Sequence, residues 1–119
     1  MKQLVAVYGT LRKGFGNHRL LSDAVFMGFD QTLPEWEMVS LGGFPALYKG
    51  GITPVTIEVY EVTEEEFKDT DRLEGYPSFY NRELIHTAYG KAWIYYIQGS
   101  PREEYLKISS GDWEKFKKE

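Results

Sequence analysis

Short apolar segments, separated by glycines and prolines, run through almost the whole of this 119-residue sequence. Segments of this length that are rich in Val, Ile, Tyr and Phe predict β-strands. Residues 55–62 form the clearest one, because Val55, Ile57 and Val59 point to one face and the residues between them to the other. The other predicted strands span residues 4–8, 25–33, 36–41, 46–48, 79–87 and 91–97. Many short strands with few helices predict an α+β fold with a curved or barrel-like sheet.

Only one stretch carries a strong helix signal. Thr63 and Glu66 have the spacing of a capping box, and the acidic residues of the first turn complement the helix dipole. Gly75 suits the left-handed position after a helix, so the helix is predicted to end there. Shorter helical turns are predicted after Asn17, a favourable N-cap residue, and in the tail at residues 109–119.

Length and composition narrow the classes of protein to which this chain can belong. A chain of this length is typical of one domain, and we expect residues 1–119 to form a single one. Hydrophobic residues make up 42% of the chain, which excludes a disordered protein. The net charge of −4 argues against nucleic acid as a partner, because such binding depends on neutralising phosphates. The N-terminal apolar run is too short for a membrane span and lacks a secretory signal pattern, so we expect a cytoplasmic protein without a membrane partner.

The sequence lacks the residues that several kinds of metal and cofactor site require. The chain has no cysteine, which excludes disulfides, cysteine-ligated zinc, iron–sulfur clusters and thiol catalysis. Gly9 and Gly14 have the spacing of a phosphate-binding loop, but Phe15 stands where its lysine should be. His18 and His86 are far apart in sequence and belong to no second ligand motif, so we expect ordinary surface or hydrogen-bonded histidines. We therefore expect neither a metal nor a cofactor.

Glu74 does not fit the pattern of its helix. It stands at the C-terminal end, where the dipole disfavours an anion, and within about 20° of the face of Phe67, which is predicted to point inward. Both features raise the pKa of a carboxyl group, and a raised pKa suits general acid–base catalysis at neutral pH. The alternatives are an ion pair with Arg72 or Arg82, or a side chain that reaches water at the helix end.

Two other functions stay open on the residues alone. Asp71 lies near the same helix face as Glu74, which allows a glycosidase with paired carboxylates, although nothing else in the sequence supports sugar chemistry. Aromatic residues make up 16% of the chain and could form a stacking platform for single-stranded nucleic acid, which the negative charge disfavours.

Four motifs occur along the chain. They are residues 8–14 (YGTLRKG), 43–47 (GFPAL), 71–77 (DRLEGYP, followed by Tyr80 and Arg82) and 110–113 (SGDW). In their order and spacing they resemble the gamma-glutamylcyclotransferase-like family over nearly the whole chain. Thr70 departs from the apolar residue that many members carry before the Asp, and this change concerns helix packing. The short chain and the Glu-Gly-Tyr-Pro form favour the branch that resembles gamma-glutamylamine cyclotransferase.

The resemblance implies a compact mixed β-barrel flanked by short helices, with a cavity at one end. It implies that Glu74 is the catalytic acid/base. It assigns binding of the gamma-glutamyl group to the loop Tyr8, Gly9, Thr10 and Leu11. Tyr80 is expected to bind substrate as well, in a leaving-group pocket that would include Phe44, Tyr76 and Phe79.

The reaction implied is intramolecular and uses a small-molecule gamma-glutamyl substrate. The α-amine of a gamma-glutamyl amine or gamma-glutamyl amino acid would attack its own side-chain carbonyl, which forms 5-oxoproline and frees the amine. Glu74 would carry the proton, and backbone N–H groups of residues 9–11 would stabilise the oxyanion. Two alternatives are a non-catalytic member of the fold that binds a small metabolite, and a protein-interaction module that uses the aromatic residues.

Overall fold

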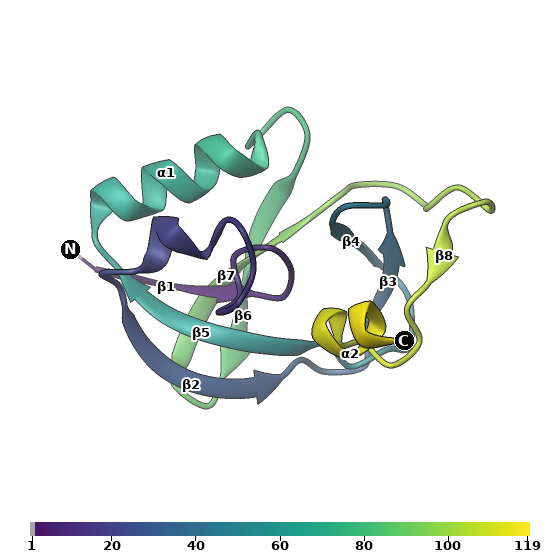
Figure 1. The fold of residues 1–119 in the computed structure, drawn as a ribbon, viewed down its shortest axis with the longest axis horizontal. Coiled ribbons are helices and arrows are strands. Elements are labelled where there is room, and N and C mark those ends of the chain that lie inside the picture. The colour runs from purple at the N-terminus through teal and green to yellow at the C-terminus, as the bar shows by residue number, and fades with distance from the viewer. Residues whose placement is uncertain (1) are drawn as a thin grey trace.

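The structure, a computed structural model, describes residues 2–119, and its strands form a five-stranded and a three-stranded sheet (Figure 1). The larger sheet has the order β2 (Val25–Gln31), β5 (Thr56–Val62), β1 (Gln3–Val7), β7 (Gly90–Tyr96) and β6 (Asn81–Thr87). Strand β1 is antiparallel to β5 and parallel to β7. The segment that follows β1 therefore leaves from the middle of the sheet.

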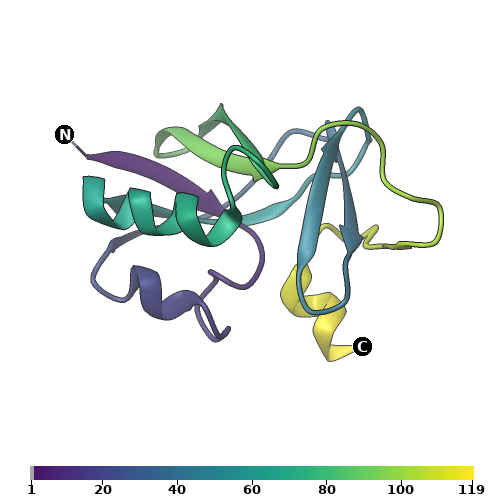
Figure 2. The same ribbon diagram turned by 90° about the horizontal axis from the view of Figure 1, so that it is seen from above.

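The smaller sheet has the order β4 (Pro45–Lys49), β3 (Trp36–Ser40) and β8 (Leu106–Lys107). Figure 2 shows it beside the larger sheet, at the side away from the N-terminus. Just after β7, the backbone N–H of Ile97 donates to the carbonyl of Leu47 in β4 at 2.8 Å, which joins the two sheets. This junction brings the start of β4 close to the end of β1.

The core lies on both faces of β5. Ile57 and Val59 pack in one cluster with Trp36 and Leu47 of the smaller sheet. Tyr60 and its neighbour Val62 belong to a second cluster, which also holds β1 residues and side chains of the two nearest helices. The alternation predicted for this strand is confirmed, and both of its faces are buried because each is covered by a different layer.

Helix α1 (Glu64–Glu74) has both of the predicted ends. Thr63 Oγ1 accepts from the Glu66 N–H at 3.2 Å, and Glu66 Oε1 accepts from the Thr63 N–H at 2.8 Å, which completes the capping box. Gly75 follows with φ +66°, the left-handed conformation that glycine adopts at little cost. The helix packs beside the short 3₁₀ helix η1 (His18–Leu21) against β1 and β5 (Figures 1 and 2).

Both of the predicted short helical turns form, and they differ in how their first turns are capped. Helix α2 (Trp113–Lys118) forms in the predicted tail, and the Asp112 side chain caps it by accepting from the Lys115 N–H. The 3₁₀ helix η1 also forms, and Asn17 holds the predicted N-cap position. Its side chain makes no cap bond and instead donates to Thr10 Oγ1 at 2.8 Å.

The α+β class is confirmed, and the predicted strands lie within a few residues of their observed bounds. Strand β8 was not predicted, because two residues carry no strand pattern. Within residues 2–119, hydrogen bonds join the strands into two sheets, and the closed barrel that the resemblance implies is not observed. Over the same residues, no helix is both long and apolar enough to cross a membrane.

Candidate active site

A cavity of about 290 Å³ opens where the end of β1, the end of α1 and the start of β4 meet. Its lining comes from six separate stretches of the chain between residues 6 and 95. The lining residues are Ala6, Val7, Tyr8, Gly9, Thr10, Leu11, Asn17, Gly43, Phe44, Pro45, Leu73, Glu74, Phe79, Tyr80 and Tyr95. The structure thus brings together Glu74, the loop of residues 8–11 and Tyr80, as well as Phe44 and Phe79 of the expected leaving-group pocket.

Glu74 is the last residue of α1 and lies half-buried in this cavity. Neither alternative ion pair forms, because Arg72 bonds to Asp69 at 3.1 Å and Arg82 bonds to Asp71 at 2.9 Å. Within residues 2–119, the Glu74 carboxylate has no salt bridge or hydrogen-bond partner. Burial raises its pKa from 4.5 to about 7. At neutral pH this group can therefore both accept and donate a proton.

Asp71, one helical turn before Glu74, is held in a very different way. It accepts two bonds from the Arg82 guanidinium, at 2.9 and 3.2 Å, and one from the Tyr95 hydroxyl at 2.6 Å. The Tyr95 hydroxyl also bonds to Thr70 Oγ1 at 2.9 Å, so the unusual Thr70 is satisfied inside the core. Asp71 does not line the cavity. This arrangement disfavours the glycosidase alternative, which needs two carboxylates facing one substrate.

Residues 9–11 present three consecutive backbone N–H groups beside the cavity. In the described part of the chain, none of the three donates to another protein group, although the carbonyls of Gly9 and Thr10 accept from the N–H groups of Arg12 and Asn17. Unpaired consecutive N–H groups form a concave site for an anion or an oxyanion.

Gly9 is required here by a close contact. A Cβ atom at this position would lie 2.8 Å from Cδ and Cγ of Pro45, the first residue of β4. The resemblance assigned Gly9 to the substrate-binding loop, and the structure adds that Pro45 of the neighbouring strand already occupies the space of a side chain. The cavity wall depends on this contact, because Pro45 lines it.

Three tyrosines line the inner part of the cavity. Tyr8 donates to the carbonyl of Tyr95, and Tyr80 donates to the carbonyl of Pro45, each at 2.7 Å. Burial raises the pKa of the Tyr8 and Tyr80 phenols far above their usual range, and the charge of Glu74 adds to the rise. Both rings therefore stay neutral, with their hydroxyls engaged by the backbone.

Several lining residues were missed by the sequence analysis as site residues. Asn17 and Tyr95 contribute to the wall, and Leu73 contributes through its position next to Glu74. Asn17 follows the first motif by three positions, and this proximity was the signal that could have found it. Tyr76 was expected in the leaving-group pocket and is absent from the lining, because its ring packs against the Arg82 guanidinium, 4.0 Å from the ring centre.

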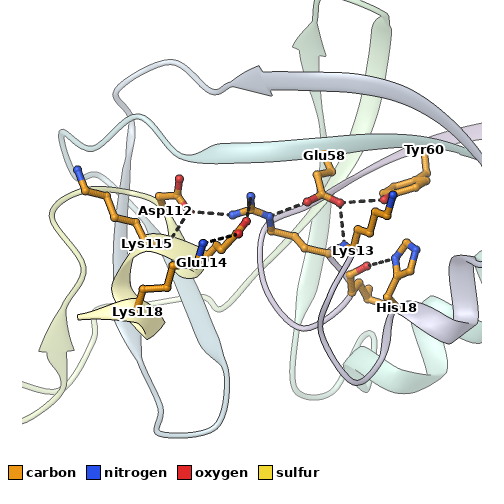
Figure 3. Close-up of polar contacts among 10 residues, drawn as sticks. Lys13, His18, Glu58, Tyr60, Asp112, Glu114, Lys115 and Lys118 are labelled. Carbon is orange, nitrogen blue, oxygen red and sulfur yellow. Dashed lines mark hydrogen bonds and ion pairs between the residues drawn. The ribbon is translucent and has the colours of Figure 1, made fainter.

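Behind the loop lies a second polar cluster, centred on buried Arg12. The guanidinium donates to Glu58 at 2.9 Å, to Asp112 at 3.0 Å and to Glu114 at 3.3 Å. Figure 3 shows Glu58 of β5 on one side of this cluster and the two acidic residues from the start of α2 on the other. Glu58 also accepts from the Lys13 N–H at 3.0 Å and the Tyr60 hydroxyl at 2.8 Å. These bonds anchor the end of the loop that lines the cavity.

No group of three or more His, Asp or Glu side chains within residues 2–119 is placed to hold a metal ion. His18 bonds through Nδ1 to the Leu11 carbonyl at 2.9 Å, which agrees with the hydrogen-bonded role expected for it.

Comparison with known proteins matches residues 5–115 to the family described as gamma-glutamyl cyclotransferase, AIG2-like. The chain belongs to this family. A Vibrio cholerae protein named, provisionally, as a gamma-glutamylcyclotransferase is 43% identical over 113 residues, which cover 95% of this chain and 96% of that protein. The Escherichia coli gamma-glutamylcyclotransferase family protein YtfP is 36% identical and covers 92% of this chain and 94% of its own. A crystal structure from Pyrococcus horikoshii matches with a TM-score of 0.84 at 32% identity, over 97% of this chain and 92% of that one.

Proposed function

We propose that this protein is a gamma-glutamylcyclotransferase that converts gamma-glutamyl amines or gamma-glutamyl amino acids into 5-oxoproline and a free amine, with Glu74 as general acid/base. One observation carries the proposal: among the described residues 2–119, Glu74 is the only charged side chain of the cavity lining, and its carboxylate has no partner and a pKa of about 7. Family membership and the names of the relatives support the class of activity.

Binding begins at the backbone of residues 9–11. Their free N–H groups would hold either the α-carboxylate of the substrate or the oxygen of the carbonyl under attack. The neutral rings of Tyr8 and Tyr80 would enclose the aliphatic part of the gamma-glutamyl group, because their hydroxyls already bond to carbonyls. Holding the chain bent, with its amine near its own carbonyl, would supply much of the acceleration.

Glu74 would then move the proton. Its carboxylate accepts a proton from the α-ammonium group, and the freed amine attacks the side-chain carbonyl carbon. As the tetrahedral intermediate collapses, the bond to the leaving nitrogen breaks and Glu74 returns its proton to that nitrogen. The new ring nitrogen loses a further proton, and the released amine takes one up from water, so the overall charge is conserved.

The proposal is tested by measuring 5-oxoproline release from a panel of gamma-glutamyl compounds that includes gamma-glutamyl-ε-lysine, gamma-glutamyl-alanine and glutathione. We expect wild type to release 5-oxoproline, and Glu74→Gln to lower kcat by about 10²–10⁴-fold while the circular dichroism spectrum is unchanged. The matched control is Glu65→Gln, an exposed position on the same helix, which should keep the wild-type rate.

Two outcomes would contradict the proposal. A Glu74→Gln variant with near-normal turnover removes Glu74 from the mechanism. A folded wild type that releases no 5-oxoproline from any compound, but gains thermal stability when 5-oxoproline is added, would instead indicate a binding protein on this fold.

A further inference from the structure

Two carboxylates of α1 lie one helical turn apart and have opposite surroundings. Asp71 and Glu74 are three positions apart, which places their Cβ atoms about 5–6 Å from each other on the helix surface. Asp71 forms a two-bond ion pair with Arg82, and the pair is shielded from water, since the two side chains are only 21% and 16% exposed. The Glu74 carboxylate has no partner within residues 2–119. A buried ion pair therefore lies next to the carboxylate that the proposed reaction needs to be free.

The Arg82 guanidinium is held at Asp71 by aromatic contacts as well as by charge. It lies over the rings of Tyr76, Trp93 and Phe67, at 4.0, 4.5 and 4.6 Å from their centres. The end of the helix brings one of these rings into place, because the Tyr76 N–H donates to the Asp71 carbonyl at 2.9 Å. The position of the cation is therefore fixed by its surroundings.

Tyr95 contacts one of the two carboxylates and is close to the other. Its hydroxyl donates to Asp71 Oδ1 at 2.6 Å, and its side chain lines the cavity together with Glu74. Burial and the bond to Asp71 raise the pKa of this phenol far above its usual range, and the charge of Glu74 adds to the rise. The ion pair and Glu74 therefore lie within electrostatic reach of each other. Burial also raises the pKa of the other phenols of this region, which stay neutral: Tyr8, Tyr48 and Tyr80.

The other basic side chains of α1, η1 and the cavity loop are bonded elsewhere or exposed to solvent. Those bonded to carboxylates or to backbone carbonyls are Arg12, His18, Arg19 and Arg72. Those exposed to solvent are Lys13 and Lys68. The charges of Asp71 and Arg82 are therefore the ones placed to act on Glu74.

We infer that Asp71 and Arg82 are positioning residues for Glu74: each charge of the pair cancels the effect of the other on the catalytic carboxylate, and Asp71 keeps Arg82 from bonding to it. This inference rests on the proposed function and extends it to two residues outside the cavity lining. Its physical basis is the sign of each charge. A nearby cation favours the carboxylate form of Glu74, and a nearby anion disfavours it.

Neutral variants of each partner provide the test. Asp71→Asn leaves the Arg82 cation without its counter-charge, so the acid limb of the pH profile of kcat/KM should move down by about one pH unit or more. Arg82→Gln leaves the Asp71 anion instead, so the limb should move up. Asp69→Asn is the matched control, because it releases exposed Arg72 on the same helix and should leave the limb in place. Unshifted limbs in both test variants, or shifts in the same direction, would overturn the inference.

Two further variants check that charge is the cause. Asp71→Asn/Arg82→Gln removes both charges, and its acid limb should return close to the wild-type position, because the two opposite effects cancel. Arg82→Lys keeps the cation and should also follow the wild-type profile. A double variant whose limb stays as far from wild type as that of either single variant would contradict the inference.

A ¹³C NMR titration of the Glu74 carboxyl, assigned with Glu74→Gln, measures the same shifts without turnover. We expect its midpoint to fall in Asp71→Asn and to rise in Arg82→Gln. Normal release of 5-oxoproline with an unshifted midpoint in both variants would contradict this inference alone. Opposite shifts of the midpoint in a protein that releases no 5-oxoproline would contradict the proposed function and support the charge balance.

Discussion

The loop that follows β1 lies between two regions, and each of them holds a glutamate away from bulk water. On one side, Glu58 is fully buried and is satisfied by the Arg12 guanidinium, the Lys13 N–H and the Tyr60 hydroxyl. On the other side, Glu74 lies half-buried in the cavity and has no partner within residues 2–119. Pairing stabilises a buried charge and holds it in one place, whereas lack of pairing leaves a carboxylate free to exchange protons. The difference separates a part of the molecule that maintains structure from a part that can carry out chemistry.

The largest effect on stability is expected from Glu58→Gln. This change removes the charge partner of a buried guanidinium, so the free energy of unfolding should fall by about 3–5 kcal/mol in urea denaturation. Glu61→Gln is the matched control on the same strand, because Glu61 pairs with Lys2 at the surface at 3.5 Å and should cost less than about 1 kcal/mol. Equal losses of unfolding free energy in the two variants would show that the buried Arg12 guanidinium does not need Glu58 as its charge partner.

The second prediction concerns the pH dependence of activity. The base form of Glu74 is required to begin the reaction, and its pKa is about 7. We therefore expect kcat/KM to fall about tenfold for each pH unit below 7, which amounts to about 10²-fold at pH 5. Measurement of kcat/KM from pH 5 to 9 checks this limb. A profile that stays flat down to pH 5 would assign the proton transfer to another group.

The third prediction concerns Glu74, whose replacement should raise the free energy of unfolding, whereas replacement of Glu58 should lower it. Because folding raises the pKa of Glu74, the charged carboxylate destabilises the folded state above pH 7. This destabilisation disappears as the pH falls below 4.5. Glu74→Gln should therefore stabilise the fold by about 3 kcal/mol at pH 8 and by close to nothing at pH 4.5. Urea unfolding of both proteins at the two pH values tests the sign. A loss of stability at pH 8 would mean that Glu74 has a stabilising partner.

The smallest effect is expected at the loop between the two regions. Gly9→Ala would push Pro45 away from the cavity wall, since the added Cβ would lie 2.8 Å from its ring, and should raise KM several-fold. Gly16→Ala is the control, because a Cβ there meets nothing within 4 Å. Steady-state kinetics should give a raised KM for Gly9→Ala and a wild-type KM for Gly16→Ala. Indistinguishable KM values would show that the wall tolerates the shift.

Local rules explain the part of the fold that the sequence predicted well. The ends of α1 follow from Thr63, Glu66 and Gly75, whose preferences act within a few residues. Glu74 stood out for the same reason, since helix geometry alone places it on the inward face of α1. Asn17 shows the limit of such rules, because it holds the N-cap position of η1 but its side chain bonds to Thr10 Oγ1 and does not cap the helix.

The sequence by itself determined the class of fold, most of the strands, the helix that carries Glu74 and the family resemblance. Tertiary structure alone decided which charges are paired. Arg82 could have bonded to Glu74, but β6 places it against Asp71, where three aromatic rings also contact it. Partners such as Arg12 and Asp112 are 100 positions apart, and no local pattern encodes a contact of that kind. Within residues 2–119, the Glu74 carboxylate has no partner because β6 directs Arg82 to Asp71.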